Sequence, residues 1–190
     1  MLDAINALFN HPLARKLFLN LRYVLVLVGV GAIAYYARPD LFVVGFAISM
    51  FGQAIQLWSF ASLVKNAELT ARGPYVLVRN PMYLGRYFLI LGFVAVTGSV
   101  VAVVAYTLFY WFYMYNRVRR EETRLAQLLG EPYRAYCGEV NRFLPDLSKL
   151  ARPAVRFFDS GVLRNNNGHW NLLGTLLAWA MLVLYRAYLR

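Results

Sequence analysis

The chain has 190 residues, of which 60% are hydrophobic; its mean hydropathy is +0.47 and its net charge is +11. Soluble domains contain roughly 45–50% apolar residues, so this composition excludes an ordinary water-soluble domain and predicts one all-α, polytopic integral membrane domain over residues 1–190. The single Cys137 excludes an internal disulfide framework, and the basic charge is typical of residues that flank membrane spans, so we expect no nucleic-acid binding.

Four or five apolar runs approach the roughly 20 residues needed to cross a bilayer core about 30 Å thick. The N-terminal segment from Met1 to Asn20 has no small-residue cleavage site, so we expect no removable signal peptide. The first predicted span extends from Leu21 to Ala37. The second, from Leu41 to Val64, is interrupted by Gln53 and Gln56, which lie about one turn apart on one face and are expected to face protein.

The next apolar run, from Met82 to Tyr115, is too long for one span and contains Arg86 near its start. The small and polar residues Thr97-Gly98-Ser99 predict the turn of a helical hairpin, so we expect two antiparallel spans. A polar region follows from Asn116 to His169. The last run, from Trp170 to Leu189, has aromatic residues near both ends and is expected either to cross the membrane as a fifth span or to lie in the interface.

The basic residues predict the orientation of these spans. With the N-terminus in the cytoplasm, 17 of the 20 Lys and Arg residues fall on the cytoplasmic side, and Arg38, Arg186 and Arg190 fall on the opposite side. Cytoplasmic loops carry an excess of Lys and Arg, so the asymmetry supports this orientation. Two polar segments share the basic face and are the candidate functional regions.

The first polar segment extends from Arg72 to Arg86. Gly73-Pro74 predicts a turn, and Pro81 fits the first position of the following helix. A helix start leaves free backbone N–H groups and the positive end of the helix dipole, which favour a carboxylate or phosphate. Arg79 and Arg86 would strengthen such an anion site; alternatively, both side chains extend to lipid head groups.

The second polar segment extends from Asn116 to Pro145. Apolar residues at helical spacing predict a helix near the membrane that ends at Gly130, and Pro132 is expected to begin another helix. The residues expected on one face of that second helix are Tyr133, Tyr136 and Val140.

Two adjacent carboxylates, Glu121 and Glu122, interrupt an arginine run in this segment close to the end of a span. A carboxylate at that position is costly to desolvate unless a cation lies nearby, so the pair is a candidate binding site. The alternative is i,i+4 pairing of Glu121 with Arg117 on a solvated face.

Three sequence blocks occur in order between residues 72 and 145. They are Gly-Pro-Tyr-x-x-x-Arg-Asn-Pro-Met-Tyr-x-Gly at 73–85, Arg-x-Arg-Arg-Glu-Glu-x-x-Leu at 117–125, and Gly-x-x-Tyr-x-x-Tyr-x-x-x-Val-x-Arg-Phe-x-Pro at 130–145. Together they resemble the isoprenylcysteine carboxyl methyltransferase and phospholipid methyltransferase family. Members of this family are small polytopic membrane enzymes that bind S-adenosylmethionine at the cytosolic face and transfer its methyl group to a lipid-like acceptor.

The resemblance implies an S-adenosylmethionine-dependent methyltransferase whose cofactor-binding core is 72–145. Its partner would be a membrane lipid or lipidated substrate, such as an isoprenylcysteine carboxylate or a phospholipid amine. No metal is expected. The residues implied to bind the cofactor are Tyr75, Val78, Arg79, Asn80, Pro81, Tyr83, Gly85, Glu121 and Glu122. Those implied at the catalytic position are Arg142, near the acceptor, and Tyr136.

The chemistry of S-adenosylmethionine suggests how these groups would be used. Glu121 or Glu122 would bind the ribose diol or the ammonium, and Arg79 with the helix start at Pro81 would hold the carboxylate. Tyr75 or Tyr83 would pack on the cofactor.

One position departs from the family pattern, because Asn80 stands where the family usually has His before the Pro. An amide can donate and accept hydrogen bonds but cannot titrate near neutral pH. Asn80 could therefore replace a His that only holds the cofactor, but not one that moves a proton.

Two other functions remain open from the sequence. A membrane sterol or enone reductase that binds NADPH has a similar Arg-His-Pro-x-Tyr block, although the acidic pair and the Arg-Phe-x-Pro ending at 142–145 favour the methyltransferase. A non-catalytic lipid-binding membrane protein would keep the fold but bind neither cofactor.

Overall fold

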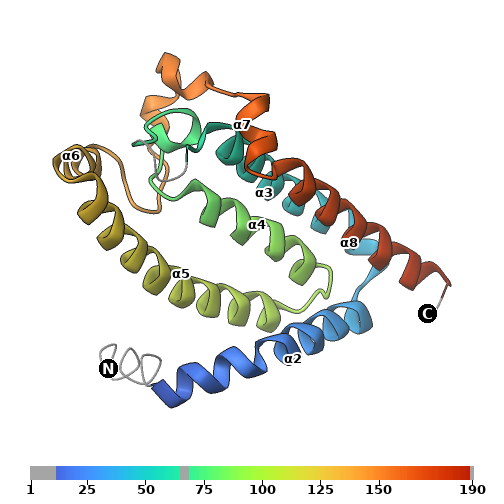
Figure 1. Ribbon diagram of the computed structural model, residues 1–190. Coiled ribbons are helices and arrows are strands. Elements are labelled where there is room, and N and C mark those ends of the chain that lie inside the picture. Colours follow the sequence, from blue (N-terminus) through green and yellow to red (C-terminus); the bar gives the residue numbers. More distant parts are fainter. Residues whose placement is uncertain (1–11, 65–68, 189–190) are drawn as a thin grey trace.

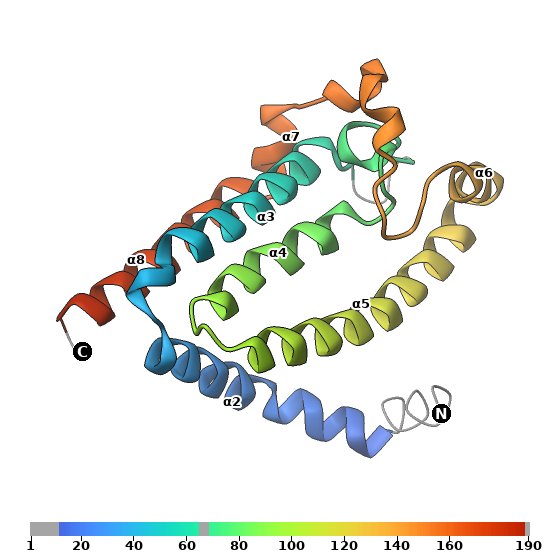
Figure 2. The ribbon, with the colours of Figure 1, turned by 180° about the vertical axis from the view of Figure 1, so that it is seen from behind.

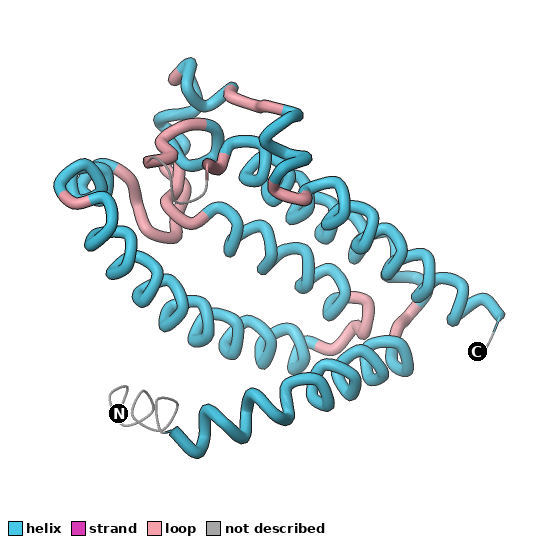
Figure 3. The backbone as a smooth tube through the Cα atoms, viewed as in Figure 1, coloured by secondary structure: helices cyan, strands magenta, loops and turns pink. Residues whose placement is uncertain are grey.

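The computed structural model describes residues 12–64 and 69–188, and within these ranges it contains helices and loops but no strand (Figure 3). The α-helices described are α2 (Pro12–Tyr36), α3 (Phe42–Ser62), α4 (Pro81–Ala95), α5 (Val100–Leu129), α6 (Glu131–Glu139), α7 (Ser160–Asn165) and α8 (Gly168–Tyr188). Short 3-10 helices are η1 (Pro39–Leu41), η2 (Gly73–Val76), η3 (Leu147–Ala151) and η4 (Pro153–Arg156). The predicted all-helical class is confirmed for the described residues.

The long helices run roughly side by side, with α4 between α5 and the neighbouring pair α3 and α8 (Figures 1 and 2). At one end, α2 crosses beneath the turn that joins α4 to α5. At the other end, α6, η2 and the loops between α6 and α7 gather together (Figure 1). The two polar segments singled out from the sequence therefore meet at one end of the bundle.

The predicted helical hairpin is formed by α4 and α5. Its turn uses Gly98 with φ +66°, and the Ser99 side chain caps α5 by accepting a hydrogen bond from the Ala102 backbone N–H at 3.2 Å. The two arms are unequal: α4 has 15 residues, fewer than a full span needs, whereas the 30 residues of α5 are roughly 45 Å long and exceed a bilayer core of about 30 Å.

The polar region after the hairpin begins as a continuation of α5 and not as a separate helix. No helix breaker lies at the junction, and the Asn116 side chain donates to the Phe112 carbonyl at 3.0 Å within the helix. Gly130, with φ +62°, ends α5 as predicted. Helix α6 stops one residue before Val140, which is extended but remains buried with the two tyrosines expected on its face.

Two described segments are long and apolar enough to cross a membrane, Pro39–Ser62 and Gly168–Tyr188. Shorter apolar helices cover Val26–Tyr36 and Pro81–Ala95. Many large apolar side chains point outward, including Val43 at 80% exposure, a surface that suits lipid better than water. Five crossings and a cytoplasmic basic face stay predictions, and residues 1–11 of the N-terminal segment lie outside the described residues.

Helices α3 and α4 approach each other most closely at glycines on both helices. A Cβ added to Gly92 would lie 2.2 Å from the Gly45 carbonyl oxygen, and one added to Gly52 would lie 2.3 Å from the Leu89 nitrogen. Ser49, also in this contact, donates its hydroxyl to the Leu89 carbonyl at 2.7 Å. Small residues at such contacts allow helix backbones to pack directly in a membrane.

Helix α8 is joined to α3 by buried amides. Gln53 donates to the Asn171 side chain at 2.9 Å and accepts from the Thr175 hydroxyl at 2.9 Å. Gln53 and Gln56 are each 1% exposed, which confirms that this pair faces protein.

Candidate functional site

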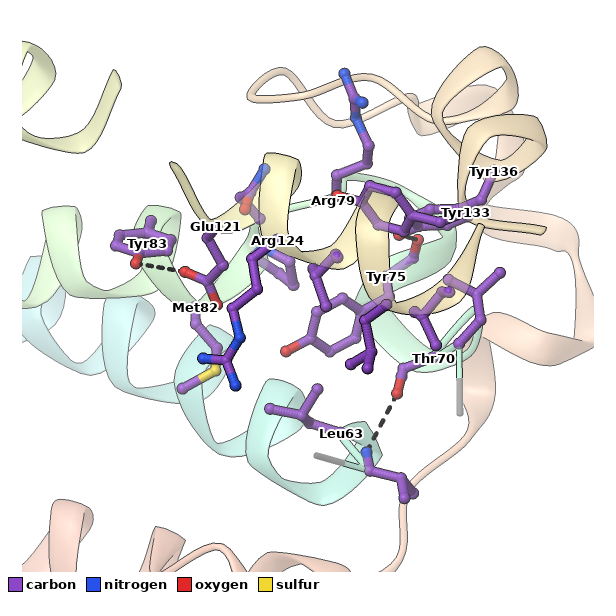
Figure 4. Close-up of a pocket in the computed structure, with 17 residues that line it drawn as sticks. Leu63, Thr70, Tyr75, Arg79, Met82, Tyr83, Glu121, Arg124, Tyr133 and Tyr136 are labelled. Carbon is purple, nitrogen blue, oxygen red and sulfur yellow. Dashed lines mark hydrogen bonds between the residues drawn. The ribbon is translucent and has the colours of Figure 1, made fainter. Parts of the chain in front are cut away.

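A cavity of about 380 Å³ opens where the two polar segments meet (Figure 4). Its volume falls within the range of roughly 300–1,000 Å³ typical of small-molecule sites. Its lining comes from residues that follow α3, from η2 and the segment before α4, and from the start of α4, the second half of α5, and α6. The lining residues are Leu63, Val64, Leu69, Thr70, Tyr75, Arg79, Asn80, Pro81, Met82, Tyr83, Glu121, Arg124, Leu125, Leu128, Leu129, Tyr133 and Tyr136.

The segment before α4 is fixed by backbone contacts. Gly73 adopts φ +58°, and a Cβ there would lie 2.0 Å from the Ser62 hydroxyl, so glycine permits both the turn and the close approach. The Arg79 N–H donates to the Asn141 carbonyl at 2.9 Å, and the Asp146 N–H donates to the Leu77 carbonyl at 2.9 Å. These bonds hold the 73–80 segment against the 141–146 segment, beside the cavity.

Glu122 is the buried centre of a polar network behind the cavity. Its carboxylate forms an ion pair with Arg142 at 2.7 Å and a longer one with Arg79 at 3.5 Å. The Asn80 amide donates to the same carboxylate at 3.4 Å and to the Arg142 carbonyl at 3.1 Å. Glu122 therefore joins α5 to the 73–80 segment, which precedes it in the chain, and to the 141–146 segment, which follows it.

Glu121 faces the cavity instead. Its carboxylate accepts a hydrogen bond from the Tyr83 hydroxyl at 2.8 Å (Figure 4). Arg117 donates to the same hydroxyl at 3.4 Å. Tyr83 thus stands between Glu121 and Arg117, which were alternatively expected to pair directly. The exposed Glu121 side chain keeps capacity for a ligand, because a carboxylate accepts several hydrogen bonds.

Arg124 lies one turn from Glu121 on α5 and extends into the same space as Tyr75 and Met82 (Figure 4). Among the described residues it has no carboxylate within ion-pair distance. Arg79, by contrast, extends away from Glu121 and Tyr75 in Figure 4, toward its partner Glu122. The cation available to a ligand in this cavity is therefore Arg124.

The tyrosines of the cavity are held in their neutral form. Burial raises the pKa of Tyr75, with the neighbouring Tyr136 and Glu121 adding to the effect. Burial also raises the pKa of Tyr136, against the opposing influence of Arg79. The Tyr136 hydroxyl donates to the Tyr75 carbonyl at 2.7 Å, so this phenol joins α6 to η2.

The structure brings most of the expected site residues together. Those that line the cavity are Tyr75, Arg79, Asn80, Pro81, Tyr83, Glu121 and Tyr136. Outside its lining lie Val78, Gly85, Glu122 and Arg142. Gly85 packs on α3, where an added Cβ would lie 2.8 Å from Gln56 Cγ, and Val78 is 3% exposed.

The sequence interpretation missed several lining residues. Arg124, Leu125 and Leu128 follow Glu121 at helical spacing, so the period of α5 could have identified them. Leu63, Val64, Leu69 and Thr70 carry no comparable signal, because these residues reach the cavity only through the packing of the chain after α3. No group of three or more metal-ligating side chains occurs in the described part of the chain.

The fold and the cavity define a helical protein, apolar on its outer surface, with a polar small-molecule site at one end of its bundle. The chain matches the family described as phospholipid methyltransferase over residues 41–132. This match confirms the resemblance carried by the sequence blocks, since residues 41–132 are similar to this methyltransferase family.

Individual relatives agree with the family match. The chain is 30% identical over 81 residues to a protein-S-isoprenylcysteine O-methyltransferase of Schizosaccharomyces pombe, an alignment that covers 43% of the chain and 34% of the relative. It is 27% identical over 115 residues to the Xenopus laevis protein of the same name, covering 54% and 40%. A probable enzyme of that name from Oryza sativa subsp. indica is 32% identical over 78 residues, covering 41% of each.

The chain thus spans about two fifths or less of the length of the curated relatives it matches. No solved structure matches the chain significantly.

Proposed function

We propose that the protein is an S-adenosylmethionine-dependent methyltransferase that acts at the membrane on a lipid-like or lipidated acceptor. The observation that carries the proposal is the cavity, most of whose lining residues fall within the matched region 41–132. It combines one available carboxylate, Glu121, one available guanidinium, Arg124, and an apolar wall. The family match and the names of the relatives support methyl transfer as the reaction.

The donor set of the cavity fits this cofactor. S-adenosylmethionine carries an ammonium or ribose diol that suits Glu121, a carboxylate that suits Arg124, and an adenine that suits the leucines of α5 and the Tyr75 ring. When bound, it supplies a methyl group from a sulfonium. NADPH fits less well, because its phosphates would meet the Glu121 carboxylate with only Arg124 available to balance them.

Glu122, Arg79 and Asn80 support the cavity wall in this proposal and do not contact the cofactor. Their mutual bonds hold Arg142 in place on the same network. Arg142 would orient the acceptor, as the family resemblance implies, from its half-exposed position beside Glu122.

The acceptor that we favour is a carboxylate attached to a lipid. A carboxylate acceptor needs no base to remove a proton, whereas an amine acceptor does, and Glu121, the carboxylate that faces the cavity, is assigned to the cofactor in this proposal. The names of the relatives specify O-methyl transfer to isoprenylcysteine proteins, and the outward apolar surface of α3 and α8 supports a membrane-borne substrate. Such a site would assist transfer by orienting the cofactor and the acceptor and not by acid–base chemistry.

Calorimetric titration of the purified protein with S-adenosylmethionine and with NADPH tests the proposal. We expect S-adenosylmethionine alone to bind, and Glu121→Gln and Arg124→Gln each to weaken it about tenfold. Glu131→Gln is the matched control, because Glu131 is exposed outside the lining and pairs with Arg134. Preferential NADPH binding, or unchanged affinity in both Glu121→Ala and Glu122→Ala, would overturn it.

A further inference from the structure

A second concave site lies on the other face of α4, between α4 and α8 and above α3. This groove has a volume of about 470 Å³ and shares no lining residue with the cavity. Its lining residues are Gln56, Arg86, Leu89, Ile90, Phe93, Trp170, Asn171, Gly174, Thr175 and Ala178. Both α4 and α8 pack on α3, so the groove is a fixed feature of the bundle.

One end of the groove is polar. Gln56 is 1% exposed, yet its Oε1 has no hydrogen-bond partner among the described residues. Gln56 Cγ packs against Gly85, the residue before Arg86. The Gln56 side chain therefore lies beside the turn of α4 that carries Arg86. Arg86 is exposed, lies 5.8 Å above the Tyr83 ring, and has no carboxylate within ion-pair distance in the described part of the chain. The lining of this end thus combines a buried acceptor with a cation that has no carboxylate partner among the described residues.

The rest of the groove is apolar. Leu89, Ile90 and Phe93 supply one wall, and Ala178 with Gly174 supplies the other. A Cβ added to Gly174 would meet nothing within 4 Å, so there is free space in front of this wall. Asn171 and Thr175 are already bonded to Gln53 and offer little to a ligand. From Arg86 to Phe93 the groove follows about 10 Å of helix, enough for the first part of an acyl chain.

We propose that this groove binds a phospholipid whose head group carries an N–H or O–H donor. The lipid phosphate would pair with Arg86, the head-group donor would bond to the unpartnered Gln56 oxygen, and one acyl chain would lie along Leu89, Ile90 and Phe93. Phosphatidylglycerol and phosphatidylethanolamine have both groups, whereas phosphatidylcholine has the phosphate but no donor. The inference concerns a site separate from the cofactor cavity and does not depend on methyl transfer.

Native mass spectrometry of the purified protein with each lipid, at matched acyl chains, tests the proposal. We expect one phosphatidylglycerol or phosphatidylethanolamine to be retained about tenfold better than phosphatidylcholine. Gly174→Leu should fill the groove and abolish this retention, and Arg86→Gln should weaken it about tenfold. Gln56→Leu should remove the preference over phosphatidylcholine.

Gly31→Leu is the matched control, because a Cβ at Gly31 on α2 also meets nothing within 4 Å but lies away from the groove. Equal retention of the three lipids, or retention unchanged in both Gly174→Leu and Arg86→Gln, would overturn the proposal. Because Arg86 is exposed, Arg86→Gln remains informative even where a groove-filling variant does not fold. Titration with S-adenosylmethionine tests the cofactor cavity separately.

Discussion

Glu121 and Glu122 are adjacent on α5, but their carboxylates lie in different environments. Glu122 is buried against Arg142 at 2.7 Å, whereas Glu121 is exposed at the cavity and bonded to the Tyr83 hydroxyl at 2.8 Å. Successive helical residues point about 100° apart, so one pair of acidic residues can serve both the wall and the interior of a site. The two positions therefore respond differently to the same substitution.

Replacing each glutamate by glutamine should separate stability from binding. Glu122→Gln leaves two guanidiniums without their counter-charge, and we expect a loss of about 1–3 kcal/mol in unfolding free energy, less than for a fully buried pair because Arg142 is partly exposed. Glu121→Gln should leave stability nearly unchanged but weaken S-adenosylmethionine binding. Thermal unfolding and calorimetry measure the two effects; equal destabilisation by both variants would contradict the division.

Asn80 should accept histidine but not aspartate. Asn80 donates to the Arg142 carbonyl and to Glu122, and a histidine N–H can keep one of these bonds. We expect Asn80→His to cost less than about 1 kcal/mol and to preserve cofactor binding. Asn80→Asp loses both donors and adds a carboxylate beside Glu122, so it should cost about 2 kcal/mol in thermal unfolding. A folded Asn80→His protein without cofactor affinity would show that the family correspondence at this position is wrong.

Tyr136 should stabilise the site through its hydroxyl. Tyr136→Phe leaves the Tyr75 carbonyl without the donor that now lies 2.7 Å away, at an expected cost of about 1–2 kcal/mol measured by thermal unfolding. Tyr115→Phe is the control, since Tyr115 is 40% exposed and forms no hydrogen bond among the described residues. If Tyr136→Phe abolishes methyl transfer without altering stability or cofactor affinity, the phenol acts in catalysis as the family resemblance implies.

Stability should be insensitive to the buried tyrosines until strongly alkaline pH. Burial raises the pKa of Tyr75, so the folded protein keeps this proton after the unfolded chain has lost it. The unfolded state then binds fewer protons, and stability falls as pH rises above about 10, the ordinary tyrosine pKa. Tyr75→Phe should reduce this alkaline fall in unfolding temperature. If the difference in unfolding temperature between the unmodified protein and Tyr75→Phe already changes between pH 7 and 9, Tyr75 is not a buried neutral phenol.

The contact between α3 and α4 should not tolerate a methyl group. Gly92→Ala places a Cβ 2.2 Å from the Gly45 carbonyl oxygen, and separating the helices should cost about 1–3 kcal/mol in thermal unfolding. Gly29→Ala on α2, where nothing lies within 4 Å, is the matched control and should be neutral or stabilising by up to about 1 kcal/mol. If Gly92→Ala and Gly29→Ala lose similar amounts of stability, the loss does not come from the contact between α3 and α4.

Local signals predicted the helical elements well. Thr97-Gly98-Ser99 marked the hairpin turn because its small and polar residues end one helix and cap the next. Gly130 marked the end of α5 because glycine readily adopts the positive φ that it has there. The two polar segments were expected on one basic face, and they do meet at one end of the bundle. The junction at Asn116 was misjudged, since a change from apolar to charged residues does not by itself interrupt a helix.

Tertiary packing determines which side chains face the cavity and the groove, and the sequence pattern alone does not show this. Which of the two glutamates faces the cavity depends on the rotation of α5 against α4, and charge pattern carries no information about it. Arg124 resembles a solvated residue in the sequence, and only the packing of α5 beside the segment before α4 makes it part of the cavity lining. The groove beside Arg86 depends on α8, which reaches α3 through Gln53 from more than 100 residues away.

The direct backbone contact of α3 with α4 has a consequence for sequence variation. Because glycines set the distance between these helices, large apolar residues on the outer surface, such as Val43 at 80% exposure, contribute little to it. Those outer positions can exchange among apolar side chains without moving Gln56, Tyr83 or Arg86. Adaptation to membranes of different lipid composition could therefore proceed on the outside of the bundle while both binding sites keep their shape.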